Sequence, residues 1–251
     1  MNLLLLALIC WAPRGAVAAD LEKLEIAVED AADIWSRKDG TGFANDVVKA
    51  AFRASGIEAV WKVEPYARCK ADVIEGRSIA CFSMSKESSV QNPVRFSDKP
   101  IFICDSDYFY NVASPVKASQ EVAIPKGTVV GTVLGYEYPD AIDDLKKKGV
   151  IFEDAGSEEA NLKKLVLGRI DLAVINANKL KSGNSMIKSA GLTGKVAFAF
   201  HGGVLESFIG FSTKHPNGER ARKLYNEGYS KIVADGTLRR IEVKWAKLGS
   251  Q

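Results

Sequence analysis

Histidine is nearly absent from the sequence, and the motifs of the common enzyme classes are missing. The only two histidines in 251 residues, His201 and His215, form no H-E-x-x-H motif and lie near no cysteine pair. The sequence also contains no G-x-S-x-G elbow, no P-loop and no G-x-G-x-x-G. A triad assembles in space rather than in sequence, but His215 in "STKHPNG" is typical of an exposed turn. We therefore expect no metal site, no cofactor and no enzymatic activity.

Long apolar runs are missing after the first residues. The run "LLLLALICW" (3–11) is too short to span a membrane, and "APRGAVAAD" follows it. This pattern predicts a signal peptide over residues 1–19, cleaved after Ala18 or Ala19, and therefore an exported protein. The alternative is that these residues form a buried first strand or helix. The abrupt change to charged sequence after them argues against this alternative.

Charge of one sign is not in excess. The chain has 34 lysines and arginines against 31 aspartates and glutamates, a formal net charge of +3 that is spread along the sequence. This balance predicts no nucleic-acid partner and no strong attraction to a membrane surface. The roughly 230 residues that follow the leader are enough for one large domain or two modest ones.

Cysteine is scarce after the leader, where only Cys69, Cys81 and Cys104 remain. Their spacings match no common zinc or redox signature. If residues 66–75 form a helix and 79–84 the strand that returns beside it, Cys69 and Cys81 lie at one height. Each is about 7 to 10 Å from the turn between the two elements. We predict a disulfide between them; three free buried cysteines are the alternative.

Two blocks of alternating strands and helices are present, with no closer repeat. Such alternation predicts an α/β fold with parallel sheets. The first block comprises strands at 21–30, 57–63 and 78–84 with helices at 42–56 and 66–75. The second comprises strands at 128–135, 150–156 and 170–176 with helices at 136–149 and 157–168, and two helices split at Asp235-Gly236 end the chain. Ligand sites in such sheets lie at the carboxyl ends of strands.

The order of these segments resembles a known family. The residues are "VED", "GFANDVVKAAF", "PYARCKADVIEGRSIACFSMS", "RFSDKP", "VVGTVLGYEYP", "NLKKLVLGRIDLAVIN" and "DGTLRRIEVKWAKL". They are similar to the periplasmic solute-binding proteins of the polar amino acid type, bacterial extracellular solute-binding protein family three. The resemblance covers essentially all of the chain after the leader, and it lies in the order and spacing of the motifs.

The resemblance implies a two-lobed, periplasmic-binding-protein-like fold of type II. Two α/β lobes are joined by two hinge strands, and a cleft between them encloses the ligand. Lobe 1 would comprise residues 20–108 and 202–251, and lobe 2 residues 109–201. The function implied is a periplasmic, monomeric protein that captures a small polar ligand by lobe closure and delivers it to the permease of an ABC-type transporter.

The two anchors for an α-amino acid in the family are replaced here. Family members usually carry T-P-E-R before F-S-D, and the arginine six residues before the phenylalanine clamps the ligand carboxylate. Counting back from Phe96 gives Val90, and Glu87 stands at the threonine position. The family aspartate that holds the ammonium, five residues after Asp171, is Asn176. We therefore expect an amino-acid-like ligand that is not a simple α-amino acid.

Candidate ligand contacts lie at strand ends and at the turn of the second block. Arg68 is the candidate replacement anchor for an anionic group, with a salt bridge as the alternative. Trp35 and Tyr66 are candidates for stacking on the ligand, with core packing as the alternative. Asn161 is interpreted as a helix-surface residue. The full set is Glu29, Asp30, Trp35, Tyr66, Arg68, Ser83, Met84, Ser85, Gly135, Tyr136 and Asn176.

Two of these candidates, Gly135 and Tyr136, are expected to open the helix of the second block, whose free amides suit an anion or a carbonyl. Two functional alternatives stay open. One is a periplasmic enzyme of the cyclohexadienyl dehydratase type, for which Glu29 is the candidate acid or base. The other is a sensory protein that passes its ligand state to a membrane partner.

Overall fold

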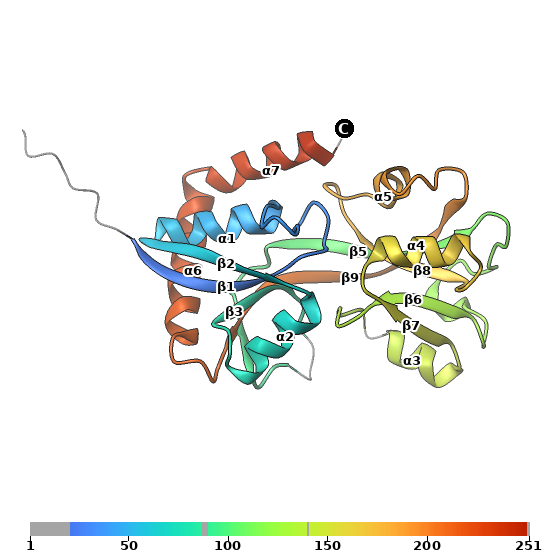
Figure 1. The fold of residues 1–251 in the computed structure, drawn as a ribbon, viewed down its shortest axis with the longest axis horizontal. Helices are drawn as coiled ribbons and strands as arrows, with labels where there is room; N and C mark the ends of the chain where they lie inside the picture. The colour runs from blue at the N-terminus through green and yellow to red at the C-terminus, as the bar shows by residue number, and fades with distance from the viewer. Residues whose placement is uncertain (1–20, 87–89, 140, 250–251) are drawn as a thin grey trace, which may run out of the picture.

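The computed structural model describes residues 21–86, 90–139 and 141–249. The predicted signal peptide and the Glu87 position lie outside these ranges. Across them the chain forms an elongated α/β molecule with two lobes side by side (Figure 1). Among the described residues, no helix is both long and apolar enough to cross a membrane.

The first lobe is built around a parallel three-stranded sheet. Its elements are β1 (Glu22–Glu29), α1 (Phe43–Ala54), β2 (Ile57–Glu64), α2 (Tyr66–Glu75) and β3 (Ala80–Met84), in the strand order β2-β1-β3. Helix α1 buries Val47, Val48, Ala51 and Phe52, one face of its 3.6-residue period. Gly76, with a φ of 85°, ends α2 in the left-handed conformation that glycine adopts readily. The alternation predicted for residues 21–84 is present.

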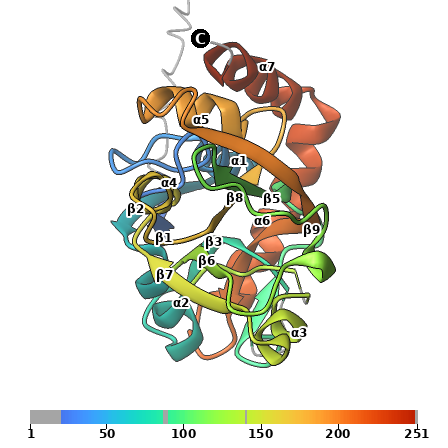
Figure 2. The same ribbon diagram turned by 90° about the vertical axis from the view of Figure 1, so that its right-hand side faces the viewer.

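The second lobe repeats this pattern. It contains a short 3₁₀ helix (Glu121–Ala123), β6 (Val129–Val133), α3 (Ala141–Lys148), β7 (Ile151–Ala155), α4 (Glu158–Val166), β8 (Leu172–Ala177) and α5 (Gly183–Ser189). Strand β6 lies between β8 and β7 and is parallel to both. Figure 2 faces this lobe and shows α3 and α5 on opposite sides of its sheet.

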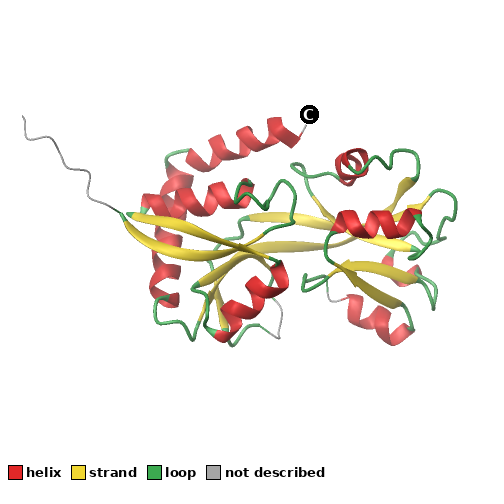
Figure 3. Ribbon diagram, viewed as in Figure 1, coloured by secondary structure: helices red, strands yellow, loops and turns green. Residues whose placement is uncertain are grey.

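Two long antiparallel strands join the lobes: β5 (Phe102–Asn111) and β9 (Val196–Ser212). They pair with each other from Phe102 to Asn111. Strand β9 also pairs with β3 and with the short β4 (Val94–Phe96) in the first lobe, whereas β5 pairs with β8 in the second. Figure 3 shows both strands running from one lobe into the other. The predicted lobe boundaries, at 108/109 and 201/202, fall within these strands.

The C-terminal helices return to the first lobe. Helices α6 (Gly218–Ala234) and α7 (Thr237–Gly249) follow each other with the predicted break at Asp235-Gly236, and α6 packs against α1. The Trp245 indole donates a hydrogen bond to Asp46 of α1 at 2.8 Å. The first lobe therefore holds both the beginning and the end of the described chain.

A disulfide joins Cys69 of α2 to Cys81 of β3, with their Cα atoms 5.7 Å apart. This is the pair favoured by the sequence. Cys104 is free and buried in β5. The bridge fixes α2, which carries Tyr66 and Lys70, beside β3, which contains Ser83 near its end and leads into Ser85.

Candidate functional site

A small cavity lies between the lobes, where strand ends of both lobes meet. The first lobe contributes Glu29 at the end of β1 and Ser83 and Ser85 around the end of β3. The second contributes the turn after β6 and the end of β8. The lining residues are Glu29, Trp35, Ser83, Ser85, Phe102, Cys104, Tyr136, Glu137, Asn176, Leu205 and Ser207. The cavity has a volume of about 20 Å³, which is room for about one water molecule. A larger ligand therefore requires the lobes to separate.

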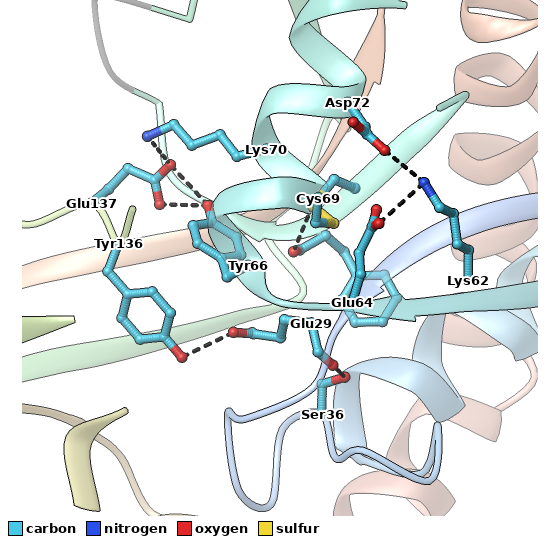
Figure 4. The surroundings of a disulfide bond; sticks show 12 residues. Glu29, Ser36, Lys62, Glu64, Tyr66, Cys69, Lys70, Asp72, Tyr136 and Glu137 are labelled. Atoms are coloured by element: carbon cyan, nitrogen blue, oxygen red, sulfur yellow. Dashed lines mark hydrogen bonds and ion pairs between the residues drawn. A yellow bond between two sulfur atoms is a disulfide. The ribbon is translucent and has the colours of Figure 1, made fainter. Parts of the chain in front are cut away.

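Direct bonds across the cleft hold the lobes together. The Tyr136 hydroxyl donates to Glu29 Oε2 at 2.9 Å. The Tyr66 hydroxyl contacts Glu137 Oε1 at 2.8 Å and Oε2 at 2.6 Å, and Lys70 Nζ forms an ion pair with Glu137 Oε1 at 2.8 Å. Figure 4 shows these side chains reaching from both sides toward the cleft. Two carboxylates, one from each lobe, are thus held by hydroxyl or ammonium groups of the opposite lobe.

The backbones of the two lobes also approach closely at Gly135. A Cβ atom at this position would lie 2.9 Å from both Cα and Cβ of Ala67 in α2. Gly135 has a φ of 84°, a conformation that side-chain-bearing residues rarely adopt. Its lack of a side chain therefore permits the turn and the contact with α2, and places Tyr136 and Glu137 in the cleft.

Glu29 is a buried carboxyl group in the cavity wall. Only 2% of the residue is exposed, and burial raises the pKa of Glu29 from 4.5 to about 7 because the charged form loses its hydration. The neighbouring hydroxyls of Ser83 and Tyr136, and more weakly the charge of Lys181, act in the opposite direction. A carboxyl group with such a pKa exchanges its proton near neutral pH.

A second buried charge pair lies behind the cavity. Lys181, 1% exposed, forms an ion pair with Glu158 at the start of α4. The other Glu158 oxygen accepts a hydrogen bond from the Asn176 backbone N–H at 2.7 Å. Lys181 Nζ also lies 4.3 Å from the ring centroid of Trp35, which stacks on Phe102 at 4.3 Å between centroids. The segment before α5 thus packs an ammonium group of the second lobe against an aromatic pair of the first lobe.

Three polar atoms of the cavity-lining residues have no hydrogen-bond partner among the described residues. They are Trp35 Nε1, Ser83 Oγ and Ser207 Oγ. Trp35 and Ser207 are each 3% exposed, and the Ser83 hydroxyl acts on the Glu29 carboxyl group. Buried donors and acceptors are almost always paired in native proteins. A ligand that carries a hydrogen-bond acceptor would satisfy them.

Several predicted site residues line the cavity. They are Glu29, Trp35, Ser83, Ser85, Tyr136 and Asn176. The Asn176 Oδ1 accepts from Ser106 Oγ at 2.9 Å, so its amide is oriented by β5. Tyr66 lies beside the cavity and bonds to Glu137 instead of lining it. Met84 packs in the core formed with Cys69, Val73 and Val94.

Other predicted residues lie elsewhere. Asp30 lines a separate hollow with Arg37 and Glu159. Arg68 is exposed and is not among the cavity-lining residues, so the predicted replacement anchor does not form in this structure. Arg68 is the third residue of α2, whose buried face carries Tyr66 and Cys69 one turn apart, and its own side chain lies off that face.

Two predictions about helices are wrong. Gly135 and Tyr136 do not open a helix, because α3 begins only at Ala141. The turn at Gly135 and the ring of Pro139, which disfavours helical geometry before it, separate them from α3. Asn161 is fully buried rather than at the helix surface, and its Nδ2 donates to the Thr132 carbonyl at 2.7 Å. It joins α4 to β6.

Further residues of the candidate site come together only when the lobes meet, and they were not predicted from the sequence. They are Lys70, Phe102, Glu137, Glu158, Lys181 and Ser207. The adjacency of Glu137 to Tyr136, and the acceptor-rich "SEE" start of α4, were the available signals. Lys181 in "NKLKSG" has no signal, since this stretch is typical of an ordinary solvated loop.

Comparison with known proteins finds likeness in structure alone. Neither a protein-family model nor a curated protein sequence matches the chain. An ancestral arginine-binding protein bound to arginine has a TM-score of 0.73 at 20% identity, over 89% of this chain and 97% of that one. An amino acid ABC transporter substrate-binding protein from Streptococcus pneumoniae, bound to L-arginine, has a TM-score of 0.72 at 13% identity, over 91% and 96%.

A third solved structure is an ancestral amino acid-binding protein described as a precursor of cyclohexadienyl dehydratase. It has a TM-score of 0.70 at 16% identity, over 89% of this chain and 95% of that one. At such identities the likeness shows the fold. The chain has the two-lobed, type II periplasmic-binding-protein fold of the polar amino acid-binding proteins, with two α/β lobes, two hinge strands and a cleft between them.

Proposed function

We propose that this protein is a periplasmic solute-binding protein that captures a small polar metabolite by closing its lobes and delivers it to an ABC-type transporter. The observation that carries the proposal is the position of the cavity. It is lined by strand ends of both lobes and sealed by bonds from Tyr136 to Glu29 and from Tyr66 to Glu137. A ligand at this position would contact both lobes and favour their closure.

The ligand we propose is amino-acid-like but not a simple α-amino acid. Val90, at the position of the carboxylate clamp, is buried in the apolar cluster with Tyr66 and Met84. Among the described residues that line the cavity there is no arginine or lysine. A ligand carboxylate would thus enter without a guanidinium partner, beside two carboxyl groups.

Export and the transporter partner are supported by the leader-like first residues and by the solved structures, one of which is an ABC transporter substrate-binding protein. We propose that the protein acts as a monomer that contacts a membrane permease with the closed lobes. The lobe boundaries we propose, after residues 108 and 201, place the hinge in the middle of β5 and β9.

An enzyme on the same scaffold is the second candidate. Its support is Glu29, whose burial in the cavity raises its pKa to about 7, where it suits proton transfer. The discriminating observation is the fate of a bound compound. A binding protein returns its ligand unchanged, whereas an enzyme converts it during overnight incubation followed by mass spectrometry.

A thermal-shift screen of amino acids, amines, organic acids and sugars tests the proposed function. We expect at least one compound at 100 times its Kd to stabilise the protein by about 2.7 kcal/mol. Ser207→Ala in the cavity should weaken this effect, and Ser230→Ala on the exposed side of α6 should not. If no compound of the four classes raises the midpoint, or if Ser207→Ala and Ser230→Ala behave alike, the proposed function is overturned.

A further inference from the structure

The charges around the cavity do not balance. Three buried carboxyl groups surround it: Glu29 and Glu137 in the lining and Glu158 behind it. Among the described residues, two ammonium groups are paired with them. Lys70 forms its ion pair with Glu137 at 2.8 Å, and Lys181 forms its ion pair with Glu158. Glu29 is left over.

Glu29 has no ion pair with any of the described residues. Its carboxyl group is bonded by the Tyr136 hydroxyl at 2.9 Å and lies beside Ser83, and Lys181 acts on it only at longer range. Burial of a carboxylate without a counter-ion is unfavourable because the charge loses its hydration. The cavity therefore has a place for one positive charge next to Glu29.

The groups around this place suit an ammonium ion with N–H donors. The Trp35 ring is already in contact with the Lys181 ammonium at 4.3 Å and stacked on Phe102, so the aromatic ring of the lining that lies beside Glu29 is that of Tyr136. Oxygen acceptors are available at Glu29, and Asn176 also lies in the lining. A primary ammonium has three donors for such acceptors, while a quaternary ammonium has none.

The unpartnered donors identify a second ligand group. Trp35 Nε1 can only donate, and the Ser207 hydroxyl can donate or accept. A neutral hydroxyl on the ligand would pair with both. A carboxylate there would meet no cationic side chain among the cavity-lining residues, and would lie in a space bounded by Glu29 and Glu137.

The cavity is too small for the ligand while the lobes are in contact. With a volume of about 20 Å³ it holds about one water molecule, so a ligand of several heavy atoms enters only after the lobes separate. In the structure, the Tyr136 hydroxyl donates a hydrogen bond to the Glu29 carboxylate. This hydroxyl belongs to the second lobe. Lobe separation withdraws it and exposes Glu29 to the ligand.

We propose that the ligand is a small primary amine that bears a hydroxyl and no carboxylate, with its ammonium group paired to Glu29. This inference rests on the proposed function of solute capture in the cleft. The ligand class follows from the unpaired carboxyl group, the neighbouring Tyr136 ring and the unpartnered Trp35 Nε1 and Ser207 Oγ, and not from the structural neighbours, which bind amino acids.

Isothermal titration with ethanolamine, glycine and choline tests the ligand class at pH 8. Ethanolamine and glycine both carry a primary ammonium group, but ethanolamine has a hydroxyl where glycine has a carboxylate. Choline keeps the hydroxyl and carries methyl groups in place of the N–H donors. We expect ethanolamine to bind at least tenfold more tightly than glycine and than choline. Glu29→Gln should weaken ethanolamine binding at least tenfold, while Glu25→Gln, at an exposed position of the same strand, should leave it unchanged.

The outcomes separate this inference from the proposed function. If glycine or another amino acid binds as tightly as ethanolamine, or if Glu29→Gln leaves ethanolamine binding unchanged, the amine proposal is overturned and solute capture stands. If no compound in the wider thermal-shift screen binds, both are overturned. Circular dichroism of Glu29→Gln and Glu25→Gln at pH 8 separates a lost contact from a lost fold.

Discussion

Replacing Glu29 by glutamine should make the stability of the protein less dependent on pH. In the unfolded chain this carboxyl group has a pKa of 4.5, and burial between the lobes raises the pKa to about 7. The native state therefore keeps its proton between these two values while the unfolded state loses it. The stability that the neutral group contributes is fully present below pH 4.5 and is lost as the pH rises toward 7.

The size of the effect follows from the two pKa values. A difference of about 2.5 units corresponds to about 3 kcal/mol at pH 8, where Glu29 is ionised in both states. A glutamine amide at this position does not ionise and keeps an acceptor for the Tyr136 hydroxyl. Glu29→Gln should therefore match the wild type at pH 4 and exceed its free energy of unfolding by about 3 kcal/mol at pH 8.

Urea unfolding followed by circular dichroism at pH 4, 6 and 8 measures this difference. The matched control is Glu25→Gln, an exposed glutamate of the same strand, which should shift stability by less than about 0.5 kcal/mol at every pH. A difference between Glu29→Gln and wild type that is constant across the three pH values would refute the reasoning. So would a variant less stable than wild type at pH 8.

Three further perturbations follow from the structure. Lys181→Met should destabilise the protein by about 3–5 kcal/mol in urea unfolding because it leaves Glu158 buried without its partner, and the added Glu158→Gln should recover part of the loss. Tyr136→Phe should cost about 1–2 kcal/mol in free energy of unfolding. Tyr225→Phe removes a buried hydroxyl that has no hydrogen-bond partner in the described part of the chain, and it should cost less than about 0.5 kcal/mol. Gly228→Ala should lower the thermal midpoint, since its Cβ would overlap a backbone carbonyl of α1.

Local sequence signals were sufficient for most of the first lobe. The apolar period of α1, the glycine that ends α2 and the alternation of β1 each depend on neighbours within a few residues. The cavity residues that could be predicted, such as Glu29 and Ser83, stand at strand ends, where the α/β pattern itself indicates a site.

The rest of the site depends on contacts between the lobes, which no local pattern encodes. Glu137 and Lys181 are ordinary charged residues in sequence, and they become buried only because Lys70 and Glu158 meet them in space. The misplaced helix start is different, because local signals indicated the correct one. Asp143 and Asp144 lie in the first turn of α3, which begins at Ala141, and Pro139 disfavours helical geometry before it, so both signals agree with the later start.

The central claim is that ligand binds between two lobes that must separate to admit it. Ala67 and Gly135 lie on opposite lobes, and a Cβ at Gly135 would be 2.9 Å from that of Ala67, so a small adjustment allows a disulfide between cysteines at both positions. The decisive measurement is isothermal titration of oxidised Ala67→Cys/Gly135→Cys with the compound that stabilises the wild type most. We expect no detectable binding by the oxidised form and measurable binding by each single-cysteine variant, with Gly135→Cys weaker than Ala67→Cys because its side chain strains the turn and crowds α2. Equal affinity of the oxidised double variant and the single variants would contradict the claim.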